Sequence, residues 1–216
     1  MTALTIAGRT VHDPLKVIGK YARKHSRTLK EYDFEPSGDP YTLTLDDVRS
    51  TRIIASRISE VEAAEIVRLA TQAGRLWAAV PAEAELRDAD PAKHGGLYDA
   101  MESLYASLQF RGVQHAKVSK VLHRKRRGAF PVLDATLMAV YRNAAAKQAA
   151  RYPDRGYRRM YWAAIREDVI ANEGGLEQLQ SDIGRISDVD LPMHKLSNVR
   201  LLDIIAWSLA NPNGSR

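Results

Sequence analysis

Apolar residues recur at steps of three and four along most of this chain of 216 residues, which is the spacing of one face of an α-helix. Clear runs of this kind cover residues 101–108, 118–122, 137–144 and 199–209. No stretch of useful length alternates apolar and polar residues as a half-buried β-strand does. The pattern therefore predicts an all-α fold with roughly eight to ten helices of ordinary length.

Capping residues mark where several of these helices begin. The pair Asp13-Pro14 combines a good N-cap with a proline at the first helical position. Thr44 and Ser59 are each followed three residues later by an acidic residue, which predicts a capping box at both places. Residues 32–41 hold two prolines and a glycine and predict a loop.

The whole chain, residues 1–216, fits a single helical domain whose centre is a hairpin element at 98–127 and a helix start at 131–146. Gly112-Val113 separates two helical runs, and glycine can take the positive φ that a tight turn needs. These residues predict a helix–hairpin–helix, in which the turn amides can come close to a phosphate.

Charge is concentrated in the same region. Between Ser103 and Leu133 there are seven basic residues and no acidic one, while the chain as a whole carries a formal net charge of +6. Lys117, Lys120 and Arg124 are spaced for one helix face, opposite the apolar face, and such a cationic stripe suits a phosphate backbone. A solvated helix face is the alternative. The basic run within 15–29 is likewise open to either interpretation.

Asp134 follows a short apolar run and opens the next helix. The order of these residues resembles the helix–hairpin–helix DNA glycosylase superfamily, in which a G-V-G-x-x-x-A hairpin precedes an apolar run and an aspartate at a helix start. Gly112-Val113-Gln114 and the segment 132–137 stand in those places, with 22 residues from Gly112 to Asp134. The pattern G-V-x-x-A-K-x-S-K-x-L-x-R-K-R-x-x-x-x-P-x-x-D is closer still to an uncharacterised bacterial family within or near that superfamily.

The resemblance implies an enzyme that hydrolyses the N-glycosidic bond of a damaged or modified base. Asp134 would stabilise the charge on the sugar and activate a water, while DNA is held by its phosphate backbone and one base is flipped out. An N-cap role for Asp134 is equally compatible with its position. The residues expected to contact DNA are Arg111, Gly112, Val113, Gln114, His115, Lys117, Lys120, Arg124 and Lys125.

Several positions depart from the family pattern. Ala116 stands where strand-cutting relatives carry a lysine nucleophile, so the resemblance implies a monofunctional enzyme. Gln114 replaces the second hairpin glycine, and Leu137 replaces a histidine. The chain has no cysteine, which excludes an iron–sulfur cluster held by thiolates. A helix–hairpin–helix protein that binds nucleic acid without catalysis is therefore the main alternative, and an RNA-directed helical protein is a third.

The remaining features limit partners and location. A sequence pI near 9.5 favours an acidic partner, and nucleic acid fits better than a membrane because no apolar run is long enough to span one. The histidines lack metal-ligand spacing, so neither a metal nor a cofactor is expected. The N-terminal residues lack a secretion signal, and we expect a cytoplasmic monomer. The three tryptophans, Trp77, Trp162 and Trp207, are expected in the core.

Overall fold

The computed structural model describes residues 3–184 and 190–211, and helices make up most of this part of the chain. The longer helices are α1 (Pro14–Lys24), α4 (Glu60–Gln72), α6 (Leu97–Ser107), α7 (His115–Lys125), α8 (Ala135–Arg151), α9 (Tyr161–Ala171), α10 (Glu173–Ile183) and α11 (Asn198–Ala210). Shorter elements are α2 (Ser26–Thr28), the π-helix η1 (Leu29–Phe34), α3 (Leu45–Ser50), α5 (Gly74–Ala79), and the 3-10 turns η2 (Thr51–Ile54), η3 (Leu86–Asp88), η4 (Pro153–Arg155) and η5 (Met193–Lys195). The predicted all-α fold is confirmed.

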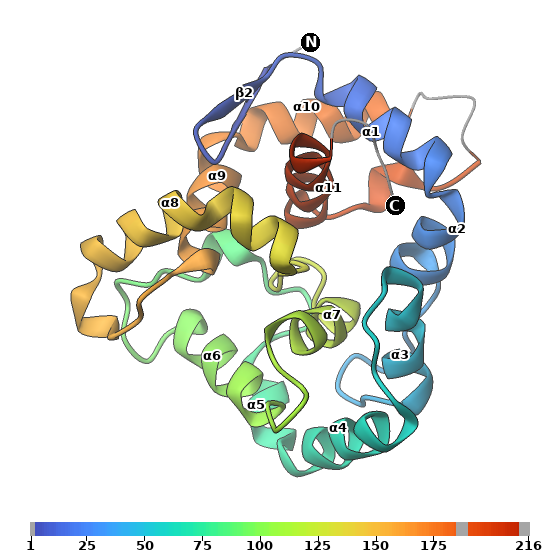
Figure 1. Cartoon of the computed structure of the whole chain (residues 1–216), viewed down its shortest axis with the longest axis vertical. Coiled ribbons are helices and arrows are strands. Elements are labelled where there is room, and N and C mark those ends of the chain that lie inside the picture. Colours follow the sequence, from blue (N-terminus) through green and yellow to red (C-terminus); the bar gives the residue numbers. More distant parts are fainter. Residues whose placement is uncertain (1–2, 185–189, 212–216) are drawn as a thin grey trace.

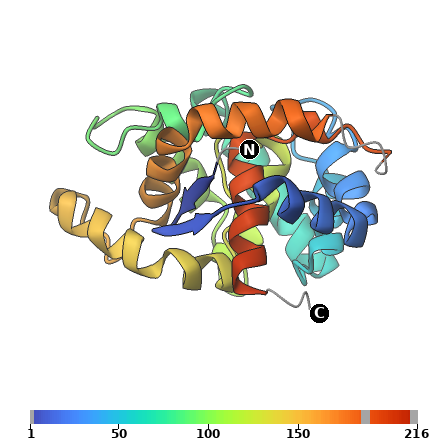
Figure 2. The same cartoon turned by 90° about the horizontal axis from the view of Figure 1, so that it is seen from above.

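The helices form two groups that share one core. Helices α1 and α8–α11 make a terminal group, and α3–α7 make a central group, with α7 and the start of α8 lying where the two groups meet (Figure 1). Within the terminal group, α11 lies between α1 and the α8–α9 pair (Figure 2). Buried apolar residues from both groups pack into a continuous cluster, so the chain ends and its middle stabilise each other.

The predicted caps are present as hydrogen bonds. The Thr44 hydroxyl accepts from the Asp47 amide while the Asp47 carboxylate accepts from the Thr44 amide, and Ser59 with Glu62 forms the same reciprocal pair. Asp13 accepts from the Lys16 amide ahead of Pro14. Each cap satisfies backbone donors that the first helical turn leaves without partners, which fixes where the helix begins.

Two local elements differ from the sequence-based expectation. A small antiparallel hairpin, β1 (Leu4–Ile6) with β2 (Arg9–Val11), precedes α1, and its strands are too short to give an alternating pattern. Its backbone is tied to α9, because Asp168 accepts from the Ala7 amide at 2.6 Å. Residues 32–41 are predicted as a loop, but residues 32–34 belong to η1, and irregular backbone starts at Glu35.

Candidate active site

The predicted hairpin is a tight turn between α6 and α7. Phe110 and Val113 exchange two backbone hydrogen bonds, and Gly112 lies between them with φ +89°. That left-handed conformation is strained for other residue types. The side chain of Gln114, which replaces a glycine of the family pattern, donates to the Phe110 carbonyl at 2.8 Å. The glutamine therefore closes the turn from outside.

The tip of the hairpin is exposed, but an acidic residue lies beside it. Arg111, Gly112, Gln114 and His115 are exposed, whereas Val113 is fully buried. A Cβ added to Gly112 would lie 3.1 Å from a carboxylate oxygen of Glu62. The same oxygen accepts from Lys117 Nζ at 2.6 Å, so the half-buried Lys117 is already neutralised.

The predicted cationic stripe is not on the surface. Lys120, Arg124 and Lys125 are each at most 6 % exposed. Lys120 donates to the Ile54 carbonyl at 2.7 Å, and Arg124 donates to three carbonyls of the segment 32–36 at 2.6 to 3.0 Å. The expectation that these side chains face solvent is wrong, because segments distant in sequence fold over the polar face of α7.

The last basic residues of this run are used in the same way. Lys125 Nζ forms a buried ion pair with Asp47 at 2.7 Å and donates to the carbonyls of Ser37 and Asp39. Arg126 is fully buried, donates to the Val80 carbonyl at 2.8 Å and lies over the ring of Trp77. Charged donors satisfy loop carbonyls that would otherwise be buried without hydrogen bonds. The basic run therefore holds the loop 33–41 in place.

An exposed basic surface lies elsewhere, on α1, α2 and η1. The segment 14–30 contains six basic residues and no acidic one, and all six side chains are exposed. This cationic surface consists of Lys16, Lys20, Arg23, Lys24, Arg27 and Lys30. Lys20 and Lys24 line a hollow that continues along α11 past Trp207. From the sequence pattern alone, this run could be either a phosphate contact or a solvated helix face.

Asp134 lies at the rim of a cavity between the two helix groups. It is the N-cap of α8, where Oδ1 accepts from the Leu137 amide at 2.9 Å, and it is partly exposed. Among the described residues Oδ2 has no hydrogen-bond partner. The Asp134 cavity has a volume of about 180 Å³, many times the roughly 10–15 Å³ that one water needs. The capping role is thus present, and one carboxylate oxygen remains for chemistry.

A second carboxyl group lines the Asp134 cavity. Asp203 of α11 is 4 % exposed, and its Oδ2 accepts from the Val132 amide at 2.7 Å, two residues before Asp134. Its Oδ1 is buried without a hydrogen-bond partner. Burial raises the pKa of Asp203 to about 7, the negative charge of Asp134 adds to this rise, and Arg200 opposes it. The cavity therefore joins an accessible carboxylate to a buried carboxyl that is partly protonated near neutral pH.

Aromatic rings form another wall of the Asp134 cavity. Tyr21, His25 and Trp207 pack together with ring centroids 4.6 to 5.9 Å apart. Trp207 is half-buried, so the prediction that it belongs to the closed core is wrong, while Trp77 and Trp162 are buried as predicted. Flat apolar rings beside carboxylates can stack on a nucleobase whose sugar lies next to the acid.

A segment that lines this cavity has an unusual backbone. Ala55, which lines the cavity, and Arg57 both have positive φ values, at 57° and 52°. Such conformations cost free energy for residues with a side chain, and they persist where surrounding contacts enforce them. Lys120 provides one such contact through its bond to the Ile54 carbonyl. A buried lysine of α7 thus shapes the cavity without being exposed to solvent.

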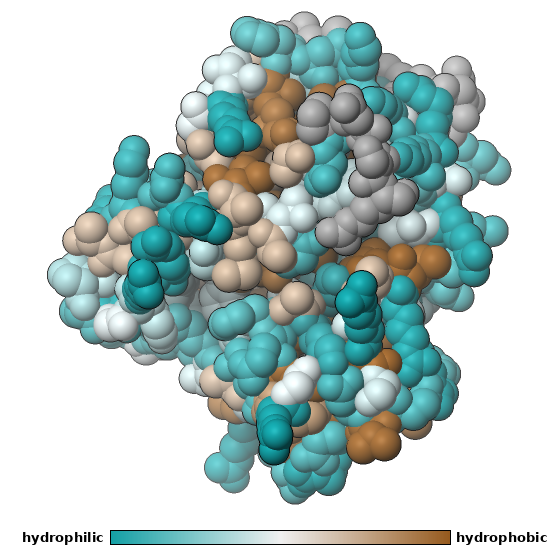
Figure 3. Space-filling model, in the orientation of Figure 1, coloured by the Kyte–Doolittle hydropathy of each residue, from teal (hydrophilic) through white to brown (hydrophobic). Residues whose placement is uncertain are grey.

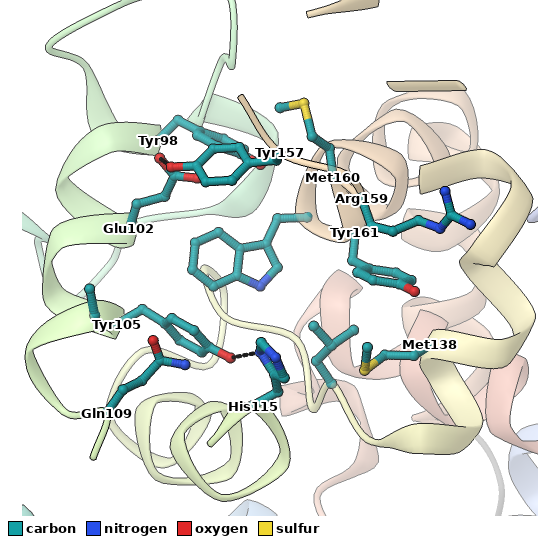
Figure 4. A pocket seen from close by; sticks show the side chains of 13 residues that line it. Tyr98, Glu102, Tyr105, Gln109, His115, Met138, Tyr157, Arg159, Met160 and Tyr161 are labelled. Carbon is teal, nitrogen blue, oxygen red and sulfur yellow. Dashed lines mark hydrogen bonds between the residues drawn. The ribbon is translucent and has the colours of Figure 1, made fainter. Parts of the chain in front are cut away.

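A larger cavity lies on the other side of the α8 start. It has a volume of about 450 Å³ and opens where the surface is hollowed between α6 and α8 (Figure 3). Its lining residues come from α6 and the residues just after it, from the starts of α7 and α8, and from the segment 157–162, and five of the thirteen are tyrosine or tryptophan (Figure 4). We call it the aromatic cavity. The rings of Tyr105 and Trp162 meet edge to face with centroids 5.1 Å apart.

Only part of this site could be predicted from the sequence. The structure brings Asp134 and Lys120 to one cavity, but it turns Lys117, Arg124 and Lys125 toward other parts of the protein. Asp203 was missed, although an acid inside the apolar run from Val199 to Trp207 is a usable signal, because a charge there must be buried or functional.

Other kinds of site can be judged within the same residues. Residues 3–184 and 190–211 contain no group of three or more histidine, aspartate or glutamate side chains arranged to hold a metal ion. In this described part of the chain, every helix is too short or too polar to span a lipid bilayer. The side chains that line the Asp134 cavity include two carboxyl groups, aromatic rings and the cationic groups of Lys120 and Arg200.

Comparison with known proteins identifies the family. The model of a family of unknown function, DUF6308, matches residues 15–210, and the chain belongs to this family. No curated protein and no solved structure matches the chain. The matched span includes all of α1 but its first residue, the hairpin, Asp134 and all of α11, so both carboxyl groups of the Asp134 cavity lie within the family region.

Proposed function

We propose that this protein is a monofunctional DNA N-glycosylase that releases a damaged or modified base by hydrolysis. The observation on which we base this proposal is the placement of Asp134, which lines a cavity with an aromatic wall and whose Oδ2 has no hydrogen-bond partner among the described residues. The cationic surface continues from that wall along α1. Together these features supply a carboxylate for the sugar, a face for the base and charges for phosphates.

In the proposed reaction, Asp134 acts on the sugar side of the bond. The bond from the sugar carbon to the base nitrogen breaks with an oxocarbenium-like transition state, and an adjacent carboxylate stabilises that positive charge. Asp134 then accepts a proton from the water that attacks the sugar carbon. Its Oδ1 bond to the Leu137 amide fixes the carboxylate at the start of α8, so Oδ2 is held in one place.

Asp203 acts on the base side of the same bond. The departing base takes the bonding electron pair and needs a proton unless it already carries a positive charge. With a pKa of about 7, Asp203 is protonated in roughly half of the molecules at neutral pH, which suits a general acid. Asp203 gives its proton to the base, Asp134 takes one from water, and exchange with solvent restores both groups.

The cationic surface is the proposed contact with the DNA backbone. The hairpin contributes less than the family pattern implies, because Glu62 lies beside Gly112 and Lys117 is already paired with that acid. Arg111 and His115 remain exposed at its tip. We therefore expect DNA affinity to depend strongly on α1 and on salt concentration, since each phosphate contact releases counterions.

A base-release assay tests this proposal. Duplexes carrying deaminated, oxidised or alkylated bases are incubated with the protein, and abasic sites are detected by strand cleavage in alkali. Asp134→Asn is a sharp variant, because asparagine is as good an N-cap as aspartate but carries no charge. We expect the wild type to produce abasic sites and the variant to be slower by roughly 100-fold or more.

The controls separate a loss of chemistry from a loss of folding or binding. Asp134→Asn must keep the melting temperature of the wild type and its affinity for the same duplex. If the protein binds duplex DNA at low salt but neither form releases any base, it is a nucleic-acid-binding protein without catalysis. If it does not bind DNA at low salt either, the proposal is refuted.

A further inference from the structure

The aromatic cavity has the size and rigidity of a ligand site. Its volume of about 450 Å³ falls within the roughly 300–1,000 Å³ of small-molecule sites. Trp162 packs edge to face against Tyr98, Tyr105 and Phe130, with centroids 5.1 to 6.0 Å apart. Because these rings hold one another in place, the cavity wall is formed before any ligand arrives.

Trp162 also provides a hydrogen-bond donor without an acceptor. The side chain lines the aromatic cavity, it is 7 % exposed, and its indole N–H has no hydrogen-bond partner. A buried donor left in this state costs roughly 1–3 kcal/mol, and a ligand atom with a lone pair would recover much of that free energy. Within this cavity the donor therefore favours a heteroatom over a purely apolar ligand.

The two sides of the cavity have opposite polar character. On one side the Tyr157 hydroxyl donates to Glu102 at 2.6 Å, and burial raises the pKa of Glu102. On the opposite side lies the guanidinium of Arg159 (Figure 4). Arg158 is next to it in sequence and exposed, and neither arginine has an acidic partner among the described residues. The cavity thus combines a polar acceptor side with a cationic side.

We propose that the aromatic cavity binds a nucleotide, with the base against the aromatic wall and the phosphate near Arg159. A nucleobase has flat faces for Tyr105 and Trp162, lone pairs for the indole N–H and amino hydrogens for Glu102. Arg159 has no acidic partner among the described residues, and the phosphate of the nucleotide would supply one. The nucleotide is either free in solution or a residue of a single strand that lies across the α8 start.

This site is distinct from the proposed reaction centre. Leu133 lines the aromatic cavity and Asp134 lines the other one, so a single strand could occupy both, but nucleotide binding needs neither Asp134 nor Asp203. Asp134→Asn should therefore bind nucleotide as the wild type does. Failure of base release and failure of nucleotide binding are consequently separate results.

Ligand-observed NMR and calorimetry with purified full-length protein test the proposal. The probes are AMP, GMP, CMP and UMP, their nucleosides, and an eight-residue oligo(dT). We expect at least one probe to bind. We expect Trp162→Phe, which keeps an aromatic ring but replaces the indole and loses its N–H, to weaken that binding about tenfold. Arg159→Met should weaken the nucleotide about tenfold and leave the nucleoside unchanged, and Lys147→Met, at an exposed residue of α8 outside the cavity lining, is the control.

The outcomes decide between the sources of the ligand as well. Binding of a mononucleotide with the expected variant effects assigns the cavity to a free nucleotide, and binding of the oligonucleotide alone assigns it to a strand. If Trp162→Phe does not fold, Arg159→Met alone decides, because Arg159 is half-buried and lies outside the hydrophobic core. No binding of any probe at millimolar concentration, or binding that neither variant weakens, would overturn the proposal.

Discussion

Replacing Lys125 by methionine measures how strongly the basic run of α7 stabilises the protein. The Lys125 side chain is fully buried and forms an ion pair with Asp47 at 2.7 Å, and Asp47 is 4 % exposed. Methionine keeps the length of the aliphatic chain and removes the charge. The change leaves Asp47 buried without its cation, and it leaves the carbonyls of Ser37 and Asp39 without a donor.

The expected loss of stability is large for a single substitution, because both members of this ion pair are buried. Removing one partner of a buried ion pair costs roughly 3–5 kcal/mol. For a chain of this length each kcal/mol lowers the melting temperature by about 2–4 °C, so we expect a decrease of roughly 10 °C. Thermal unfolding followed by circular dichroism at 222 nm measures the melting temperature, and a urea titration measures the free energy of unfolding.

Lys147→Met is the matched control, because Lys147 is exposed on α8 and has no partner among the described residues. We expect the control to change stability by at most about 0.5 kcal/mol. If Lys125→Met melts within 2 °C of the wild type, Lys125 does not hold the loop 33–41. If it keeps its stability but loses DNA affinity, the interpretation of α7 as a phosphate-binding stripe returns.

Two further substitutions test local features. Gly112→Ala should lower the free energy of unfolding by roughly 1–2 kcal/mol, because φ is +89° and the new Cβ would lie 3.1 Å from Glu62. Gly174→Ala is the control, because this glycine lies inside α10 with open space around it, and the change should be neutral or slightly stabilising. Equal melting temperatures of the two variants would contradict the assigned turn. Asp203 holds its proton more tightly in the folded than in the unfolded chain, so its contribution to stability falls as pH rises from about 4 to 7. Because a rise in pKa from 3.8 to about 7 corresponds to roughly 4 kcal/mol, Asp203→Asn should melt well above the wild type at pH 8.5 and close to it at pH 4.5. A difference in melting temperature that does not change with pH would show that the Asp203 carboxyl is not perturbed.

The parts of the fold that depend only on residues close together in the sequence could be predicted from it. The capping boxes at Thr44 and Ser59, the N-cap at Asp134 and the turn at Gly112 each follow from a few adjacent side chains, and all four are present. Local hydrogen-bond chemistry determines these features, and it is similar in every protein. The helical class follows from apolar spacing for the same reason.

The exposure of charged residues could not be predicted in this way. A polar helix face such as that of α7 is the same in sequence whether solvent or another segment covers it. The loop 33–41 and the turn η2 fold onto α7 from more than 60 residues away, and they use its lysines and arginines as hydrogen-bond donors. Tertiary packing decides this, because buried carbonyls without donors are costly.

The candidate site was missed in part for a related reason. Asp134 belongs to a recognisable motif, but its companions in the cavity come from α1 and α11, which are separated in sequence by more than 170 residues. Neither Tyr21 nor Asp203 carries a motif of its own. Only the folded chain brings the aromatic wall, the buried carboxyl and the accessible carboxylate together.

We propose that Asp134 stabilises positive charge on a sugar bound in the Asp134 cavity between the two helix groups. The most direct measurement compares affinity for two duplexes, one with a cationic pyrrolidine in place of an abasic sugar and one with the uncharged tetrahydrofuran. We expect the wild type to prefer the cationic duplex by about tenfold or more, and Asp134→Asn to lose that preference while it binds the uncharged duplex unchanged. Equal affinity of the wild type for both duplexes, or the same preference in Asp134→Asn, would contradict the claim.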